Sequence, residues 1–202
     1  MGSGGAALSE SAVTAARPGA ADSGPTSPIV IVGSMAVGKS TVGRALATRL
    51  GWRFRDSDDD LVATRHITGR ELAERDGVDA LHRWEADHLL GTLARPHQPV
   101  VVAAAASVVD DADCRAALRE PFVVWLRAPA GVLARRMESD AEAHDHRRRL
   151  DDADAHSVEA VADLAARRGE RFAAVADLPI DTVADGVTKT PEDIVAAIVA
   201  AL

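Results

Sequence analysis

The stretch VGSMAVGKSTVG, residues 32–43, follows directly on the short apolar run PIVIV at residues 28–32. It fits the phosphate-binding pattern G-x-x-x-x-G-K-[ST] through four residues, Gly33, Gly38, Lys39 and Ser40. The β-branched run before it and the helical apolar periodicity after it supply the strand and the helix that such a loop needs. Lys39 and Lys189 are the only lysines in the sequence, so a chance match is on the order of one in a thousand. We therefore predict a loop that binds the phosphates of a nucleotide.

The chemistry of this loop follows from its residue types. Glycines let backbone N–H groups converge on phosphate oxygens, and the N-terminus of the following helix adds its dipole. Lys39 is predicted to bridge the β- and γ-phosphates, and the Ser40 hydroxyl is predicted to ligate Mg²⁺. The loop alone is compatible with a kinase, a GTPase, an ATPase motor or an inactive binding domain.

Two of these classes are disfavoured by the rest of the sequence. A GTPase reads guanine with an Asn/Thr-Lys-x-Asp element, and the candidate TKTP at residues 188–191 has Pro191 where the acid is needed. A motor needs a clear apolar strand that ends in catalytic acids. The nearest match is ASVVDD at residues 106–111, which is more typical of a helix start. These exclusions favour a small kinase.

Apolar runs alternate with helical periodicity from residue 28 to the end of the chain. Strand-like runs cover residues 28–33, 52–58, 99–104, 122–127 and 178–182. Helical patterns cover residues 39–51, 79–94, 129–138, 157–176 and 191–201. Such alternation predicts an α/β fold in three layers, a parallel sheet with helices on both faces. Ligands of these sheets bind at the carboxyl ends of the strands.

Composition limits the partners and the compartment. The net charge of −8 over 202 residues argues against a general nucleic-acid or membrane surface, which would be basic. The single cysteine, Cys114, fits a reducing cytoplasm. Residues 1–27 are rich in Gly, Ala, Ser and Pro and lack the pattern of a signal peptide, so we predict a disordered tail before one domain at residues 28–202. No apolar run reaches membrane-spanning length.

The stretch RDSDDDLV, residues 55–62, places acidic residues at the end of the second predicted strand. Carboxylates there can hold Mg²⁺ through water or accept a proton from a substrate hydroxyl. In an extended chain Asp56 and Asp58 point the same way, because one residue separates them. The alternative is an acidic helix N-cap. We favour the functional interpretation for these two residues and interpret Asp59 and Asp60 as cap acids.

Three stretches together resemble the shikimate kinase family across nearly all of residues 29–202. They are GxxxxGKSTVGRALATRLG, DSDDDL and ITGRELAERDGVDALHRWE, in the order and spacing of that family. The resemblance implies a nucleoside-monophosphate-kinase-like fold with five parallel strands, flanking helices and a mobile lid, here about residues 139–156. It also implies a monomer that uses ATP and Mg²⁺ to phosphorylate the 3-hydroxyl of shikimate, a small molecule.

On the nucleotide side, the resemblance assigns ATP-binding roles to Gly33, Ala36, Val37, Gly38, Lys39, Ser40, Thr41, Arg136, Arg147 and Pro191. Lys39 and Arg147 are implied to be catalytic, Arg147 through the stretch RRRL that aligns with the family's lid. Arg136 and Pro191 align with the pair that flanks adenine. Ser40 and Asp56 are the implied metal residues, Asp56 from the second coordination sphere.

On the acceptor side, Asp58 is implied to bind the substrate hydroxyls and to act as catalytic base, and Arg168 to bind the substrate carboxylate. Two departures from the family pattern concern this side. His82, in LHRWE, stands where the family motif Phe-Arg-x-x-Glu has a carboxylate-binding arginine. Residues 104–106, with Ala105 at the centre, replace a Gly-Gly-Gly turn. A sugar-acid (gluconate-like) or cyclic-polyol kinase and a degenerate ATP-binding module therefore stay open as alternatives.

Overall fold

The computed structural model describes residues 27–95, 99–143, 157–184 and 186–202 of the chain. The predicted tail lies outside these residues except for Ser27, and so does the predicted lid from residue 144 onward. No helix among the described residues is both long and apolar enough to span a membrane.

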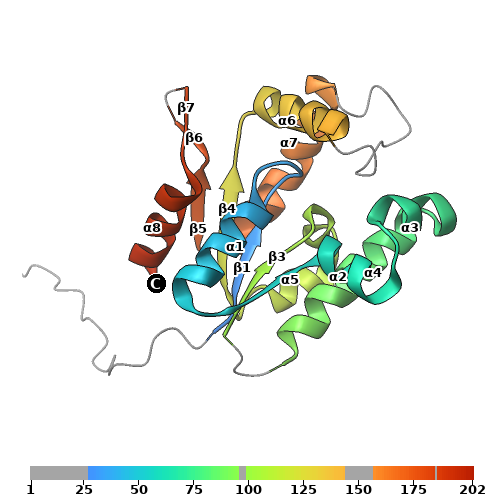
Figure 1. Ribbon diagram of the computed structural model, residues 1–202, viewed down its shortest axis with the longest axis horizontal. Coiled ribbons are helices and arrows are strands. Elements are labelled where there is room, and N and C mark those ends of the chain that lie inside the picture. Colours follow the sequence, from blue (N-terminus) through green and yellow to red (C-terminus); the bar gives the residue numbers. More distant parts are fainter. Residues whose placement is uncertain (1–26, 96–98, 144–156, 185) are drawn as a thin grey trace, which may run out of the picture.

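A five-stranded parallel sheet forms the centre of the molecule (Figure 1). Its strands are β1 (Ile29–Val32), β2 (Arg53–Asp56), β3 (Val100–Ala103), β4 (Phe122–Arg127) and β5 (Leu178–Asp181). They lie in the order β2-β3-β1-β4-β5, and every neighbouring pair is parallel. Each of the five predicted strands is present, but the second ends at Asp56, because residues 57 and 58 belong to a helix. The carboxyl ends of the strands therefore meet at one edge, where ligands of such sheets bind.

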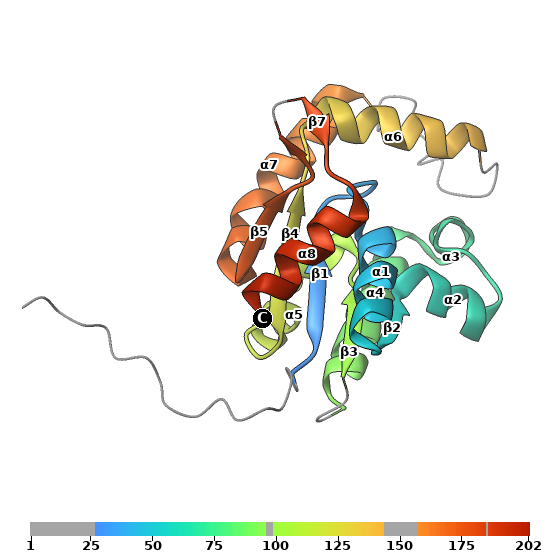
Figure 2. The same cartoon turned by 60° about the vertical axis from the view of Figure 1, so that its left-hand side comes forward.

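Alternate residues of β1 enter two separate cores, because successive side chains of a strand point to opposite faces. Ile29 and Ile31 pack with residues of α1 (Lys39–Leu50), α6 (Ala130–Ala143) and α8 (Pro191–Ala201). Val30 and Val32 pack with residues of α4 (Val78–Leu93), α5 (Ala112–Ala117) and α7 (Val158–Val175). Helices thus cover both faces of the sheet (Figure 2), and the three-layer α/β prediction is confirmed.

Two helices that the sequence patterns did not predict lie beyond the β2 edge of the sheet. These are α2 (Ser57–Arg65) and α3 (Gly69–Asp76), which pack with α4 around a small third core of Leu61, Leu72 and Leu81. Thr68 and Glu71 form a capping box that starts α3. This side unit follows directly on the acidic end of β2, so its packing decides where the acidic residues point.

Two further short elements complete the description. The 3₁₀ helix η1 (Ala106–Val109) and α5 follow β3, and Asp111 caps α5 by accepting from the Cys114 backbone N–H at 2.8 Å. The interpretation of residues 106–111 as a helix start is therefore confirmed. A hairpin of β6 (Val183–Ala184) and β7 (Val187–Thr188), which was not predicted, leads into α8.

Candidate active site

The loop between β1 and α1 has a backbone that few residues could adopt. Gly33 has a φ of +143°, and a Cβ atom there would lie 2.4 Å from the carbonyl oxygen of Leu126. Gly38 has a φ of +104°, and Ala36 has a φ of 60°. A left-handed alanine costs about 1–2 kcal/mol, and such strain is typical of functional loops. The loop that the sequence pattern predicted therefore turns through left-handed positions.

Lys39 is the first residue of α1 and reaches back over this loop. Its Nζ donates to the carbonyl oxygens of Gly33 at 3.0 Å and Ser34 at 2.9 Å. Ser40 and Thr41 are exposed in the first turn, and the buried Val37 anchors the loop in the core. The N-cap of α1 is a glycine without a capping side chain, so the first backbone N–H groups of α1 receive no side-chain acceptor. Such a helix N-terminus favours an anion.

Helix α6 meets the loop through Arg136. Its Nη1 donates to the carbonyl oxygens of Ala36 at 3.3 Å and Val37 at 3.4 Å. Pro191, the residue that the resemblance pairs with it, is the first residue of α8. No hydrogen bond that the structure gives for Arg136 in the described residues reaches α8. Arg147 lies outside the described part of the chain.

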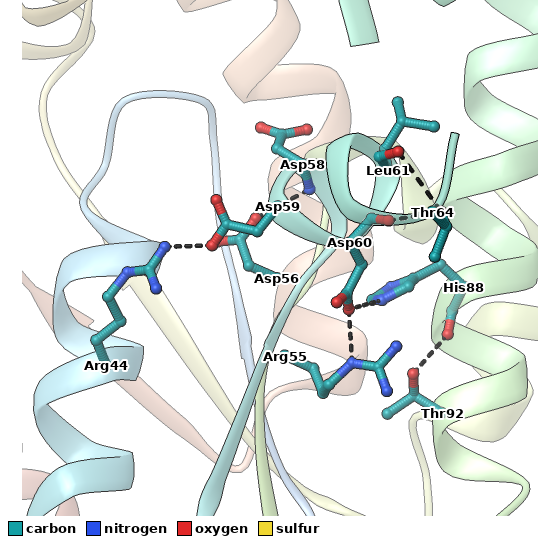
Figure 3. Close-up of polar contacts among 10 residues, drawn as sticks. All are labelled: Arg44, Arg55, Asp56, Asp58, Asp59, Asp60, Leu61, Thr64, His88 and Thr92. Atoms are coloured by element: carbon teal, nitrogen blue, oxygen red, sulfur yellow. Dashed lines mark hydrogen bonds and ion pairs between the residues drawn. The ribbon is translucent and has the colours of Figure 1, made fainter. Parts of the chain in front are cut away.

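The acidic turn at the end of β2 differs from the extended chain that its spacing predicted (Figure 3). The buried Asp56 accepts from the backbone N–H of Asp58 at 2.9 Å and so caps α2, which begins at Ser57. The prediction that Asp56 and Asp58 point the same way along a strand is wrong, because Asp58 belongs to the first helical turn. Asp58 is exposed there, at the carboxyl edge of the sheet.

Asp59 and Asp60 lie in the first turn of α2, as expected of acids at a helix start, and both also form ion pairs. Asp59 pairs with Arg44, which ties α2 to α1. Asp60 Oδ2 accepts from Arg55 Nε of β2 and contacts Nε2 of His88 in α4, each at 2.6 Å (Figure 3). The His88 ring is buried and stacks on Trp84 at 5.2 Å. The acidic turn is therefore held by a helix on either side.

The acceptor side predicted from the resemblance involves α4 and the segment after β3. His82 is exposed on α4, and Glu85 of the same helix is buried and accepts from the Ser107 hydroxyl. Apart from glycines, Ala36 and His66 alone among the described residues have a positive φ. Residues 104–106 therefore carry no left-handed strain, and Ala105 has a φ of −59°. The backbone cost considered for alanine at these positions does not arise.

Arg168 lies on α7, where its side chain is 13% exposed. Its Nε donates to Oδ2 of Asp110 at 2.8 Å, its Nη2 lies 2.7 Å from the same oxygen in an ion pair, and Arg171 donates to Oδ1 of this carboxylate. Burial raises the pKa of Asp110, but the hydrogen bonds and charges of the two arginines lower it by more. The pKa of Asp110 therefore lies below its ordinary value. No local pattern marks Asp110 or Arg171 as partners of Arg168, because 58 residues separate Asp110 from Arg168.

The donor set of this edge fits Mg²⁺. No three His, Cys, Asp or Glu residues of the described part of the chain form a metal cluster. Mg²⁺ does not need one, because it binds through one or two protein oxygens, substrate phosphates and water. Ser40 offers an exposed hydroxyl, and the described contacts of Asp56 use Oδ1 only.

Comparisons with known proteins identify the family and the fold. A family model described as shikimate kinase matches residues 35–202. The shikimate kinase of Nitratidesulfovibrio vulgaris is 35% identical over 167 residues, which cover 79% of this chain and 93% of that one. A shikimate kinase from Acinetobacter baumannii, solved in complex with shikimate, has a TM-score of 0.73 at 26% identity and covers 86% of this chain and 90% of its own.

Another solved shikimate kinase, from Bacteroides thetaiotaomicron, has a TM-score of 0.72 at 20% identity, with 87% of this chain and 99% of that one covered. A gluconokinase from Sinorhizobium meliloti has a TM-score of 0.51 at 22% identity, with 87% and 90% covered, which is a likeness of fold alone. The chain is an ATP- and Mg²⁺-dependent phosphotransferase with a hydroxyl group as acceptor. It belongs to the shikimate kinase family.

Proposed function

We propose that this chain transfers the γ-phosphate of ATP to the 3-hydroxyl of shikimate. The observation that carries the proposal is the arrangement at the carboxyl edge of the sheet. The phosphate loop with Lys39 and the acidic turn with Asp56 and Asp58 follow strands that end at this edge. The Arg44–Asp59 ion pair joins the helices that carry them. In-line transfer needs such a pairing of a phosphate site with a hydroxyl site.

In the nucleotide half of the mechanism, positive charges offset the negative charge of the phosphates. Lys39, which donates to loop carbonyls here, would turn to the β- and γ-phosphates of bound ATP and offset the charge that develops in transfer. Ser40 would hold Mg²⁺ directly and Asp56 through water, and the ion neutralises phosphate charge when bound. Arg147, outside the described residues, is proposed to reach the same phosphates. Arg136 and Pro191 are proposed to flank the adenine.

In the acceptor half of the mechanism, side chains orient the hydroxyl and the carboxylate of shikimate. Asp58 would orient the hydroxyl of shikimate and accept its proton as the new oxygen–phosphorus bond forms. Arg168 would bind the carboxylate of shikimate, with His82 as a weaker polar partner. The backbone at Ala105 would contact the ring, since Ala105 stands at the centre of the segment that replaces the family's glycine turn.

The domain boundaries, the oligomeric state and the partners of the enzyme are part of the same proposal. We place the kinase domain at residues 28–202, with a lid at about residues 139–156, and expect a cytoplasmic monomer without nucleic-acid or membrane partners. The single Cys114 supports a reducing compartment, because it is buried and unpaired. Burial raises the pKa of its thiol to about 12.

The test is an acceptor screen with purified full-length protein, ATP and Mg²⁺. Shikimate, gluconate and a cyclic polyol without a carboxylate are supplied separately, and ADP release is followed together with the mass of the product. We expect shikimate to gain one phosphate faster than the other two. Faster turnover of gluconate or the polyol would contradict shikimate as the acceptor. ATP binding without transfer to any acceptor would instead support the degenerate module.

A further inference from the structure

We propose that Asp110 is a positioning residue for the acceptor site, because it fixes one edge of the Arg168 guanidinium so that the remaining donors meet the acceptor's carboxylate. The inference rests on the proposed function, in which Arg168 binds that carboxylate. It adds a residue that does not itself touch the substrate.

The hydrogen bonds of Arg168 use one edge of its guanidinium. Nε donates to Oδ2 of Asp110, and Nη2 lies 2.7 Å from the same oxygen in an ion pair. A guanidinium has five N–H donors in a rigid plane, so fixing this edge also fixes the direction of the Nη1 end. Nη1 donates to no group of the described residues. The Arg168 side chain is 13% exposed, so an anion that reached this end would be largely removed from water.

Asp110 also brings a second cation to the site. Arg171 lies one helical turn after Arg168 on the same face of α7 and donates to Oδ1 of Asp110. Two like charges at this spacing repel each other when no anion lies between them. With Asp110 between them, the three side chains carry a net charge of about +1, which suits a monoanionic acceptor. The lowered pKa of Asp110 keeps its carboxylate charged at neutral pH.

The position of Asp110 links α7 to the rest of the acceptor side. Asp110 directly follows η1, the 3₁₀ helix that starts at Ala106, the last residue of the alanine segment. Ser107 of η1 donates to the buried Glu85 of α4, the helix that carries His82. Asp110 thus connects Arg168 to the segment expected to line the substrate. Because His82 replaces an arginine, Arg168 carries more of the carboxylate contact, and its orientation matters more.

A double-mutant cycle tests this inference with steady-state kinetics. Arg168→Ala should raise the KM for shikimate by roughly ten- to a hundredfold. Asp110→Ala should raise it about tenfold, with kcat and the KM for ATP within about twofold of wild type. In the double variant, Asp110→Ala should add almost nothing to the effect of Arg168→Ala, because its role depends on Arg168. Asp110→Glu should restore part of the loss.

The matched control is Asp111→Ala. It removes the cap of α5, and so lowers stability, but it leaves the Arg168 contact intact. Its KM for shikimate should equal that of wild type. A lower KM in Asp110→Ala would overturn the inference, because Asp110 would then compete with the acceptor. Additive effects in the double variant would also overturn it, since Asp110 would act independently of Arg168.

The wild-type assay separates this inference from the proposed function. Turnover of shikimate by wild type with an unchanged KM in Asp110→Ala would refute the inference alone. If wild type uses another carboxylate-bearing acceptor, the proposed function fails and the cycle is run on that acceptor with the same expectations. If the acceptor has no carboxylate, both fail, because Arg168 then has no anion to bind.

Discussion

The phosphate loop of the site comes from one short stretch of chain, whereas the predicted acceptor side is assembled from elements far apart in the sequence. Lys39 contacts carbonyls five and six residues before it. On the acceptor side, the contact between Glu85 and Ser107 spans 22 residues, and that between Asp110 and Arg168 spans 58. The first side depends on backbone conformation within a loop. The second depends on side-chain pairs that exist only after the helices have packed.

The two sides also differ in whether their backbone can accommodate alanine in place of glycine. At Gly33 the backbone has φ +143° and a Cβ would meet the Leu126 carbonyl, so alanine is not accommodated there. Residues 104–106 follow β3 with ordinary negative φ, and alanine is accommodated without strain. The phosphate loop therefore tolerates few changes of residue type. The acceptor side can change residues while keeping its backbone, which is how substrate preference can shift within one fold.

The largest effect is expected on the nucleotide side. Lys39→Ala should reduce phosphoryl transfer to any acceptor by at least about a thousandfold, because it removes the charge that meets the transferred phosphate. The fold should persist, since Lys39 is only partly buried at the start of α1. The chain's other lysine supplies the control, and Lys189→Ala should retain full activity. Near wild-type turnover by Lys39→Ala would remove the basis of the kinase mechanism.

The second effect concerns the junction of the two sides. Asp58→Asn keeps the size of the side chain but removes its charge and basicity, so kcat should fall by roughly 10²–10⁴ while ATP binding changes little. Asp59→Asn, one residue further along α2, is the matched control: it loses the ion pair with Arg44 that joins α1 and α2, and its kcat should fall far less than that of Asp58→Asn. Steady-state kinetics and ATP titration measure both. Weaker ATP binding with an unchanged kcat would assign Asp58 to metal binding or helix capping.

Much of the fold could be predicted because its signals are local. The five strands are short apolar runs, and the phosphate loop is a contiguous pattern, so both follow from residue types and spacing. Helices α2 and α3 were not predicted, because they are short, mostly polar segments stabilised by packing against α4. The start of α2 at Ser57 also explains the error at Asp58.

The acceptor side could be predicted only through resemblance, residue by residue. The resemblance assigns Arg168 to the acceptor's carboxylate, which stays a prediction, but it does not point to its partners Asp110 and Arg171, because a resemblance carries over only matching positions. The pairing of Asp60 with His88 was missed for a related reason, since 28 residues separate them. Acidic residues near a helix start have capping as their ordinary local explanation. Only the packed structure shows which of them reach another element.

A smaller effect is expected from restoring a residue of the family pattern. His82 is exposed on α4, so an arginine fits there without disturbing the core. His82→Arg should lower the KM for shikimate by about tenfold, because it adds one charge-assisted hydrogen bond to the carboxylate. His82→Gln, which stays polar without a charge, should give no such gain. An unchanged KM in His82→Arg would indicate that the acceptor carboxylate does not reach this helix.

The smallest effect is a pH-dependent difference in stability, and it probes the charge cluster on the acceptor side. The pKa of Asp110 is lower in the folded protein than its ordinary value, so its ionised form stabilises the fold above the ordinary pKa. That contribution is lost as the pH falls through the lowered pKa. Because Asp110 is about one-third exposed, we expect Asp110→Asn to cost only about 0.5–1 kcal/mol at pH 7. Urea unfolding at a series of pH values should show this difference shrinking below about pH 4, and added salt should also reduce it. A difference that stayed constant with pH would mean that Asp110 acts through packing and not through its charge.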